Sequence, residues 1–329
     1  MLMIIDVHLQ SGSIIEIGKS FHIIMFWVMY GYILKLKKNY TESYRIHIKK
    51  RIKVIMYPYF TLSMINIGIC LGRAMCSSVR YNVLKKYIFN TVSFRGIGTL
   101  WFLPVMFISS IIFWSFVKKM DEKKGVMFSA CCSVIAFLIS FGLEYADIKE
   151  TYGVLTYMYN ISIVILTSTI ALGFMAVGYI LAGTRKYFLN CEHKNIVVLV
   201  IITCVAYMLD NKMISNYTSD LHFFKIGNPV IFVSCSMLGM IGTFCLSCLL
   251  SYSKYIGRYL GFIGRNSLIV MTTHKEFYVN YVIYIVISSF GDVNNAILGI
   301  ISLIIICIVE SIIILIVNNS WMKKLYKLP

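Results

Sequence analysis

Residues 21–53, FHIIMFWVMYGYILKLKKNYTESYRIHIKKRIK, decide the fold class of this 329-residue chain. They begin with an aromatic residue and a histidine, His22, and continue as an apolar run close to the length of a membrane helix. They end in a dense basic segment. An apolar helix with a titratable ring at one end and a cationic cluster at the other predicts a site reached from both faces of a bilayer.

The composition of the whole chain supports a membrane protein. Apolar residues make up 59% of the sequence and the mean hydropathy is +0.78, which is more apolar surface than a soluble core can bury. Only four prolines interrupt the apolar runs, which favours helices over a barrel. We therefore expect an all-α, polytopic membrane helical bundle with about nine to ten transmembrane helices, in which residues 1–329 form a single membrane-embedded domain.

Nine apolar stretches are candidates for the roughly 20-residue length of a membrane span. They are 21–35, 54–72, 97–117, 125–143, 158–184, 195–209, 227–251, 266–290 and 294–318. Residues 1–8, MLMIIDVH, read as the end of a further helix. We therefore expect a first helix that is truncated at the N-terminus.

The positive charge predicts the orientation of these helices. The formal net charge of +17 lies in short loops between apolar stretches, which favours a membrane orientation signal over nucleic-acid binding. One set of alternating loops holds 21 of the 31 Lys and Arg residues and the other set holds nine, with Lys275 inside a predicted span. We expect the richer set to be cytoplasmic. The protein is then a multi-pass protein of the cell membrane, with its C-terminus in the cytoplasm and membrane lipids as partners.

Three histidines are candidates for chemistry. His8 and His22 are predicted at the external ends of neighbouring helices, where imidazole can take a hydroxyl proton near neutral pH. An interfacial position in the headgroup region explains His22 equally well. His274 lies within the 266–290 stretch, where an ionisable group should face protein or water. Alternatively, 266–290 is two shorter elements with His274 at an interface.

The basic segment is a candidate anion site. Lys49, Lys50, Arg51 and Lys53 offer point charges and a guanidinium fork that suit a pyrophosphate group. The alternative is a positively charged anchor that contacts anionic lipid. The six histidines are scattered, and no carboxylates accompany them at metal-ligand spacing, so we expect no metal site.

Five motifs in order resemble one family, the acyltransferase family 3 integral membrane proteins, in particular the fucose 4-O-acetylase-like branch. The motifs are Phe21–Tyr32, the basic approach Lys50–Tyr59 that ends in Pro-Tyr, Leu100–Pro104 (LWFLP), Ile226–Phe232 (IGNPVIF), and Ile263–Leu268 (IGRNSL) with His274 beyond it. The family's Met-Pro after the helix-2 histidine is Ile23-Ile24 here. The family's first helix ends in an essential histidine, which His8 matches.

The resemblance implies a membrane O-acyltransferase. Its donor would be cytoplasmic acetyl-CoA, with the phosphates near the basic segment, and its acceptor a hydroxyl of a surface glycan or lipid-linked sugar. His8, with His22, would activate the acceptor hydroxyl or carry the acyl group briefly, and no metal is implied. Trp101, Asn266 and His274 would line the site, the first two with N–H groups that suit an oxyanion.

Two alternatives remain open from the sequence. One is a non-enzymatic carrier or exporter of a glycan precursor or anion, and the other is an inactive truncated paralogue. A carrier is disfavoured because the sequence shows no internal repeat of the kind common in transporters. The sequence leaves the acceptor sugar and the oligomeric state undefined.

Overall fold

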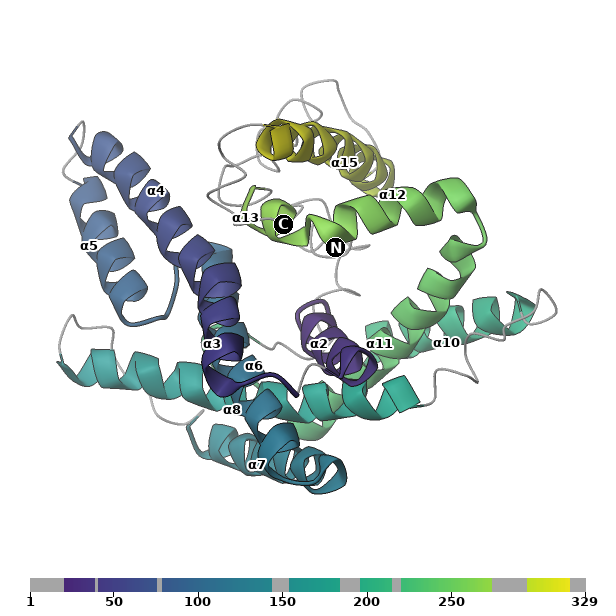
Figure 1. Ribbon diagram of the computed structural model, residues 1–329. Helices are drawn as coiled ribbons and strands as arrows, with labels where there is room; N and C mark the ends of the chain where they lie inside the picture. Colours follow the sequence, from purple (N-terminus) through teal and green to yellow (C-terminus); the bar gives the residue numbers. More distant parts are fainter. Residues whose placement is uncertain are drawn as a thin grey trace. The chain divides into compact units, whose positions relative to one another are not determined.

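The computed structural model describes residues 21–38, 41–75, 79–143, 154–183, 196–214, 220–273 and 295–319. Within these ranges the chain is helical and forms no β-strand, apart from one isolated bridge between Asp220 and Lys225. The predicted all-α class is confirmed. Figure 1 shows that the helices differ greatly in length.

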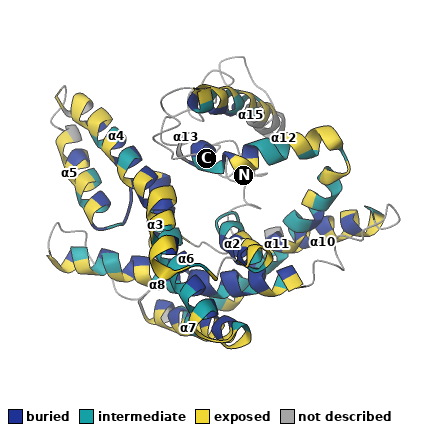
Figure 2. Ribbon diagram, viewed as in Figure 1, coloured by how far each residue is buried: buried dark blue, intermediate teal, exposed yellow. Residues whose placement is uncertain are grey.

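Five of the described helices are long and apolar enough to cross a membrane. They are 44–72, 98–119, 122–140, 154–183 and 229–251, and two shorter apolar helices cover 196–210 and 304–319. Side chains exposed on such helices face lipid rather than water. On α7 (Glu122–Leu143), for example, Val134, Ile135 and Leu138 are all more than half exposed, and exposed residues run along α4, α5 and α7 in Figure 2. The fold is a polytopic helical membrane protein.

The described chain divides into two compact units. The first unit comprises residues 27–182 with the short segment 220–226. It contains most of α2 (Ile24–Lys37), then α3 (Tyr44–Arg51), η3 (Ile52–Met56), α4 (Tyr57–Ala74), α5 (Val79–Val92), η4 (Gly98–Trp101), α6 (Phe102–Lys119), α7 and α8 (Val154–Gly183).

Helices α2 and α8 cross with their backbones in contact. A Cβ on Gly31 would lie 1.9 Å from the carbonyl oxygen of Met175, and a Cβ on Gly178 would lie 1.9 Å from that of Val28. Only glycine fits at such a crossing, which is a common device for packing helices in membranes. The fully buried Trp27 lies next to this crossing and stacks on Phe174 at 6.1 Å.

Two regions between the predicted spans are helical. Residues 36–53 separate the predicted spans 21–35 and 54–72, but from Tyr44 onward they form α3, which continues through η3 into α4 without a break. Residues 73–96 separate the predicted spans 54–72 and 97–117, but they contain α5, which folds back along α4 (Figure 1). Tyr59 donates a hydrogen bond to the carbonyl of Thr91 at 2.9 Å, which fixes the end of α5 to the start of α4.

The two termini of α6 serve as reference points for the two ends of the first unit. Its 18 residues span about 27 Å at 1.5 Å per residue. Lys118 at its C-terminal end bonds to Glu42, whereas Trp101 immediately precedes its N-terminal end. α3 runs antiparallel to α6, because Glu42 lies beside Lys118 and His47 lies beside Trp114.

The second unit comprises residues 1–26, 183–219 and 227–320. Its described helices are α10 (Ile196–Ile214), α11 (Pro229–Ser251), α12 (Lys254–Arg265), α13 (Ser267–Thr273) and α15 (Asn295–Asn319). α10 packs on α11, and Tyr207 and Thr243 share a 3.1 Å hydrogen bond there. Asn228 caps α11 by accepting hydrogen bonds from two backbone N–H groups, and Pro229 occupies the first turn, where its missing N–H costs nothing.

Candidate functional site

The predicted phosphate-binding residues lie where one helix changes its winding. Ser43 caps the start of α3 by accepting a 3.5 Å hydrogen bond from a backbone N–H in the first turn. The end of α3 and the start of η3 then carry Lys49, Lys50, Arg51 and Lys53. η3 is wound as a π-helix, a rare form found frequently at functional sites. Of the four, Arg51 is half-buried and the three lysines are exposed.

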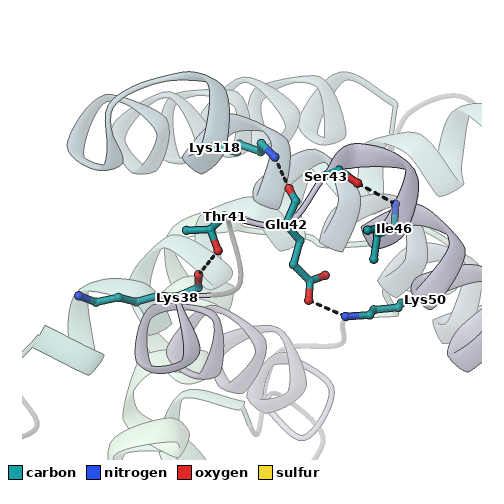
Figure 3. A network of polar contacts seen from close by, with 7 residues as sticks. All are labelled: Lys38, Thr41, Glu42, Ser43, Ile46, Lys50 and Lys118. Atoms are coloured by element: carbon teal, nitrogen blue, oxygen red, sulfur yellow. Dashed lines mark hydrogen bonds and ion pairs between the residues drawn. The ribbon is translucent and has the colours of Figure 1, made fainter.

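Glu42 lies between lysines of two helices, as Figure 3 shows. Its carboxylate Oε1 lies 2.5 Å from Nζ of Lys50, and its backbone carbonyl accepts a hydrogen bond from Nζ of Lys118. The hydrogen bond from Lys50 lowers the pKa of Glu42, so this pair is charged at neutral pH. Exposed pairs of this kind contribute at most about 1 kcal/mol. An incoming anion can therefore take Lys50 from Glu42 at little cost.

Arg51 contacts a buried tyrosine that is bonded to the middle of α6. Its guanidinium lies over the ring of Tyr30, 4.7 Å from the ring centroid. Tyr30 is buried, and its hydroxyl donates a 3.1 Å hydrogen bond to the carbonyl of Ser110. Ser110 is in the middle of α6, so Arg51 is linked to the midpoint of this span rather than to its end. A cation at such a depth is costly and is usually functional.

His47 occupies the interface of α3 with α6. Its ring stacks on Trp114 with centroids 4.1 Å apart and planes 9° from parallel. The residue is 3% exposed, and its Nε2 has no hydrogen-bond partner in the part of the chain that the structure describes. Leaving a buried polar nitrogen unsatisfied costs about 1–3 kcal/mol. Sequence reasoning assigned His47 no separate role, because the tryptophan beneath it is distant in sequence.

The opposite end of α6 carries a second stacked histidine. His222 lies flat on Trp101, with centroids 5.4 Å apart and planes 7° from parallel. Its Nε2 lies 3.2 Å from the backbone carbonyl of Arg95, and since a carbonyl only accepts, Nε2 carries the proton. In the neutral ring the lone pair is then on Nδ1. Trp101, which we predicted to line the site, is thus next to an imidazole of defined tautomer.

A tight turn holds His222 in this position. The Asp220 carboxylate accepts hydrogen bonds from the backbone N–H groups of His222 and Phe223, at 2.8 and 3.3 Å. The Arg95 guanidinium lies over the Phe223 ring, 5.1 Å from its centroid. Sequence analysis did not single out His222. The Asp220–Lys225 bridge that positions it is too short to leave a periodic signal.

In the second unit, Asn266 belongs to a polar seam between α13 and α15. It is 9% exposed, donates to the carbonyl of Phe262 at 2.9 Å and accepts from Asn318 at 3.1 Å. Further along the seam, Glu310 is fully buried and accepts a 2.6 Å hydrogen bond from Thr273. The other carboxylate oxygen of Glu310, Oε1, has no partner among the described residues. A carboxyl group buried in a membrane span is a functional candidate in its own right.

The three predicted histidines have different outcomes. His22 is half-buried and lies two residues before the start of α2. His8 and His274 lie outside the described residues, so their assignment stays a prediction, and α13 ends at Thr273. No group of three His, Cys, Asp or Glu side chains able to hold a metal ion occurs within the described ranges.

Comparison with known proteins places the whole chain in one family. The family model of acyltransferase family 3, described as an acyltransferase domain, matches residues 2–316. No curated protein and no solved structure matches the chain. The match extends over all five motifs from which we predicted the family, while the fucose 4-O-acetylase-like branch stays a prediction. This chain therefore belongs to acyltransferase family 3 and is a multi-pass membrane acyltransferase.

Proposed function

We propose that the protein transfers an acetyl group from acetyl-CoA to a hydroxyl group of a surface glycan or lipid-linked sugar. The observation that carries the proposal is the position of Arg51. Arg51 is flanked in the sequence by the exposed lysines Lys49, Lys50 and Lys53. Its guanidinium is linked through Tyr30 to the midpoint of α6. A guanidinium fork and neighbouring ammonium groups suit the phosphates of coenzyme A.

This geometry shortens the distance that the acetyl group has to cross. If the phosphates bind near Arg51, at the level of Ser110, the pantetheine arm needs to extend toward Trp101 at the other end of α6. Nine residues separate Ser110 from Trp101 in the sequence, which is about 14 Å along the helix, half of the full span. The donor can thus enter from the cytoplasmic side while the acceptor approaches from the external side.

The proposed chemistry is a direct acyl transfer. His8 or His22 takes the proton of the acceptor hydroxyl, whose oxygen attacks the thioester carbonyl. N–H groups such as those of Trp101 and Asn266 stabilise the oxyanion of the tetrahedral intermediate. The carbon–sulfur bond then breaks, and the proton passes from the imidazole to the coenzyme A thiolate. His274 lines the same site in this proposal, and no metal takes part.

We propose the cell membrane as the location, with the C-terminus in the cytoplasm. The loop charges support this orientation, because the positively charged set includes residues 323–327. A reporter active only outside the cytoplasm, fused after Pro329, should be silent, whereas a fluorescent protein at the same point should fluoresce. The reverse pattern would contradict the orientation.

The proposed activity is tested by measuring alkali-labile acetate on surface glycans of a deletion strain. The strain is complemented with the wild-type gene, with His8→Ala or with His22→Ala. We expect only the wild-type gene to restore acetate. Normal glycan with unchanged acetate in the deletion strain would reject the proposed acceptor. A glycan that fails to reach the surface would favour the carrier hypothesis instead.

A further inference from the structure

His47 has a buried ring nitrogen that no described residue satisfies. The ring is fixed by stacking on Trp114, and its Nε2 lacks a hydrogen-bond partner among the residues that the structure describes. Buried polar atoms are almost always hydrogen-bonded, so an orphan of this kind in a side chain 97% buried needs an explanation. A ligand that is absent from the isolated chain supplies one.

The charges around His47 define the chemistry of that ligand. The side chains that act electrostatically on the ring are Arg51, Lys50 and Lys118, which are positive, and Glu42, which is negative. Positive charge therefore prevails, and a cationic ligand is disfavoured. An anionic oxygen accepts, so it pairs with Nε2 in the tautomer that carries the proton there, and imidazole with guanidinium and ammonium groups is typical of phosphate recognition.

Lys118 lies beside the same tryptophan ring as His47. Its Nζ lies 4.9 Å from the ring centroid of Trp114, which is the ring beneath His47, and 5.0 Å from that of Tyr44. Two aromatic rings and the Glu42 carbonyl thus position the ammonium group beside α3. Lys118 was not part of the predicted basic segment, because it comes from α6.

We propose that His47 Nε2–H, Lys118 and Arg51 together bind one phosphoryl group. The occupant is a phosphate of the acyl donor or the phosphate of an anionic lipid headgroup, since both offer the same oxygens. The first source rests on the proposed function and the second does not. In the first case His47 adds an uncharged donor to a site that the sequence predicted to consist of charges alone.

The test replaces the imidazole without removing the ring. His47→Phe keeps the aromatic stack on Trp114 and deletes the N–H, and it also removes the unsatisfied buried nitrogen. A purely structural His47 predicts equal or higher thermal stability and unchanged ligand affinity. Our proposal predicts equal or higher stability together with an affinity for coenzyme A about 10-fold lower, the value of one hydrogen bond to a charged group. Lys118→Met, which keeps the aliphatic stem, should lower it comparably.

Tyr207→Phe is the control for binding. It also removes one hydrogen-bonding group and keeps the ring, at the contact of α10 with α11, where Tyr207 shares a hydrogen bond with Thr243. Coenzyme A binding is measured by calorimetry with the full chain in phosphatidylcholine nanodiscs. In a second arm, the melting temperature is compared between phosphatidylcholine and phosphatidylglycerol nanodiscs without coenzyme A.

The outcomes separate the two sources. Weaker coenzyme A binding in His47→Phe, with binding by Tyr207→Phe unchanged, supports a donor phosphate. In another outcome, the wild-type protein does not bind coenzyme A, and phosphatidylglycerol raises the melting temperature of wild type but not of His47→Phe. The phosphoryl site then stands with a lipid occupant, and the acetyl-CoA proposal fails. If His47→Phe behaves as wild type in both arms, the phosphoryl site at His47 is refuted.

Discussion

The crossing of α2 and α8 allows the most direct test of the fold. Gly31→Ala places a methyl group 1.9 Å from the carbonyl oxygen of Met175, whereas ordinary contacts begin at 3.4 Å. The helices have to separate by the difference, about 1.5 Å, because a backbone carbonyl in a helix cannot rotate away. Overpacking of this kind costs about 3 kcal/mol, at the upper end of the usual range, because the obstacle is backbone.

The control is the same substitution in open surroundings. Gly68 is also in an apolar helix, α4, and a Cβ there meets nothing within 4 Å. In both variants alanine favours the helix by about 1 kcal/mol, so Gly31→Ala is destabilised by about 2 kcal/mol net and Gly68→Ala is stabilised by about 1 kcal/mol. A difference of about 3 kcal/mol corresponds to about 4 °C in melting temperature for a chain of 329 residues, at about 2.1 cal/mol/K of unfolding entropy per residue.

The assay is thermal unfolding of both purified variants in detergent, followed by intrinsic tryptophan fluorescence. Gly178→Ala should resemble Gly31→Ala, and the double variant should lose less than the two single losses combined, because one separation of the helices relieves both clashes. If Gly31→Ala unfolds at or above the temperature of Gly68→Ala, the backbone contact between α2 and α8 is wrong.

Four further predictions concern charged groups. Glu42→Gln frees Lys50 and should raise the affinity for coenzyme A by up to about fivefold at neutral pH, measured by calorimetry; an unchanged affinity would mean that Lys50 does not contact the donor. Lys50 lowers the pKa of Glu42. The stabilising effect of the pair is therefore complete above the usual pKa of 4.5 and is lost as the pH falls through the lowered pKa. On acidification below pH 4.5, wild type should lose more thermal stability than Glu42→Gln. Arg51→Lys removes the guanidinium fork and should weaken coenzyme A binding about 10-fold with little change in melting temperature, and binding as tight as that of wild type would count against Arg51 as the phosphate contact. Glu310→Gln replaces a buried carboxyl group that has one unsatisfied oxygen and should raise the melting temperature, whereas a clear fall would indicate a cationic partner outside the described residues.

Hydrophobic length predicted the membrane helices well. The stretches 97–117 and 227–251 correspond closely to η4 with α6 and to α11, because an apolar run bounded by polar residues leaves the chain few alternatives in lipid. The sequence did not predict the polar helices, because they contain no long apolar run. α3 and α5 contain many charged residues, and they are helical because each packs on an apolar span, α6 or α4. α12 likewise lies between two predicted spans, 227–251 and 266–290.

The candidate site was predicted only where residues are close in sequence. The basic segment and LWFLP are contiguous motifs, and the structure places both on unit 27–182 with 220–226, at different levels of α6. The stacking of His47 on Trp114 and of His222 on Trp101 joins residues from distant segments. Such pairs depend on the register between helices and turns, which a single sequence does not specify.

The π-type winding of η3 determines how an insertion or deletion of one residue would affect this helix. An extra residue in one turn rotates everything before it by about 100° relative to an uninterrupted α-helix. Val54 and Phe60 can therefore face outward while His47 faces α6, although all three are on one rod. Deleting a single residue from 52–56 would restore the regular winding and rotate His47 away from Trp114 of α6. The half of the helix that carries His47 and the lipid-facing half are thus oriented independently, and an insertion or deletion here would reorient one half without changing the other.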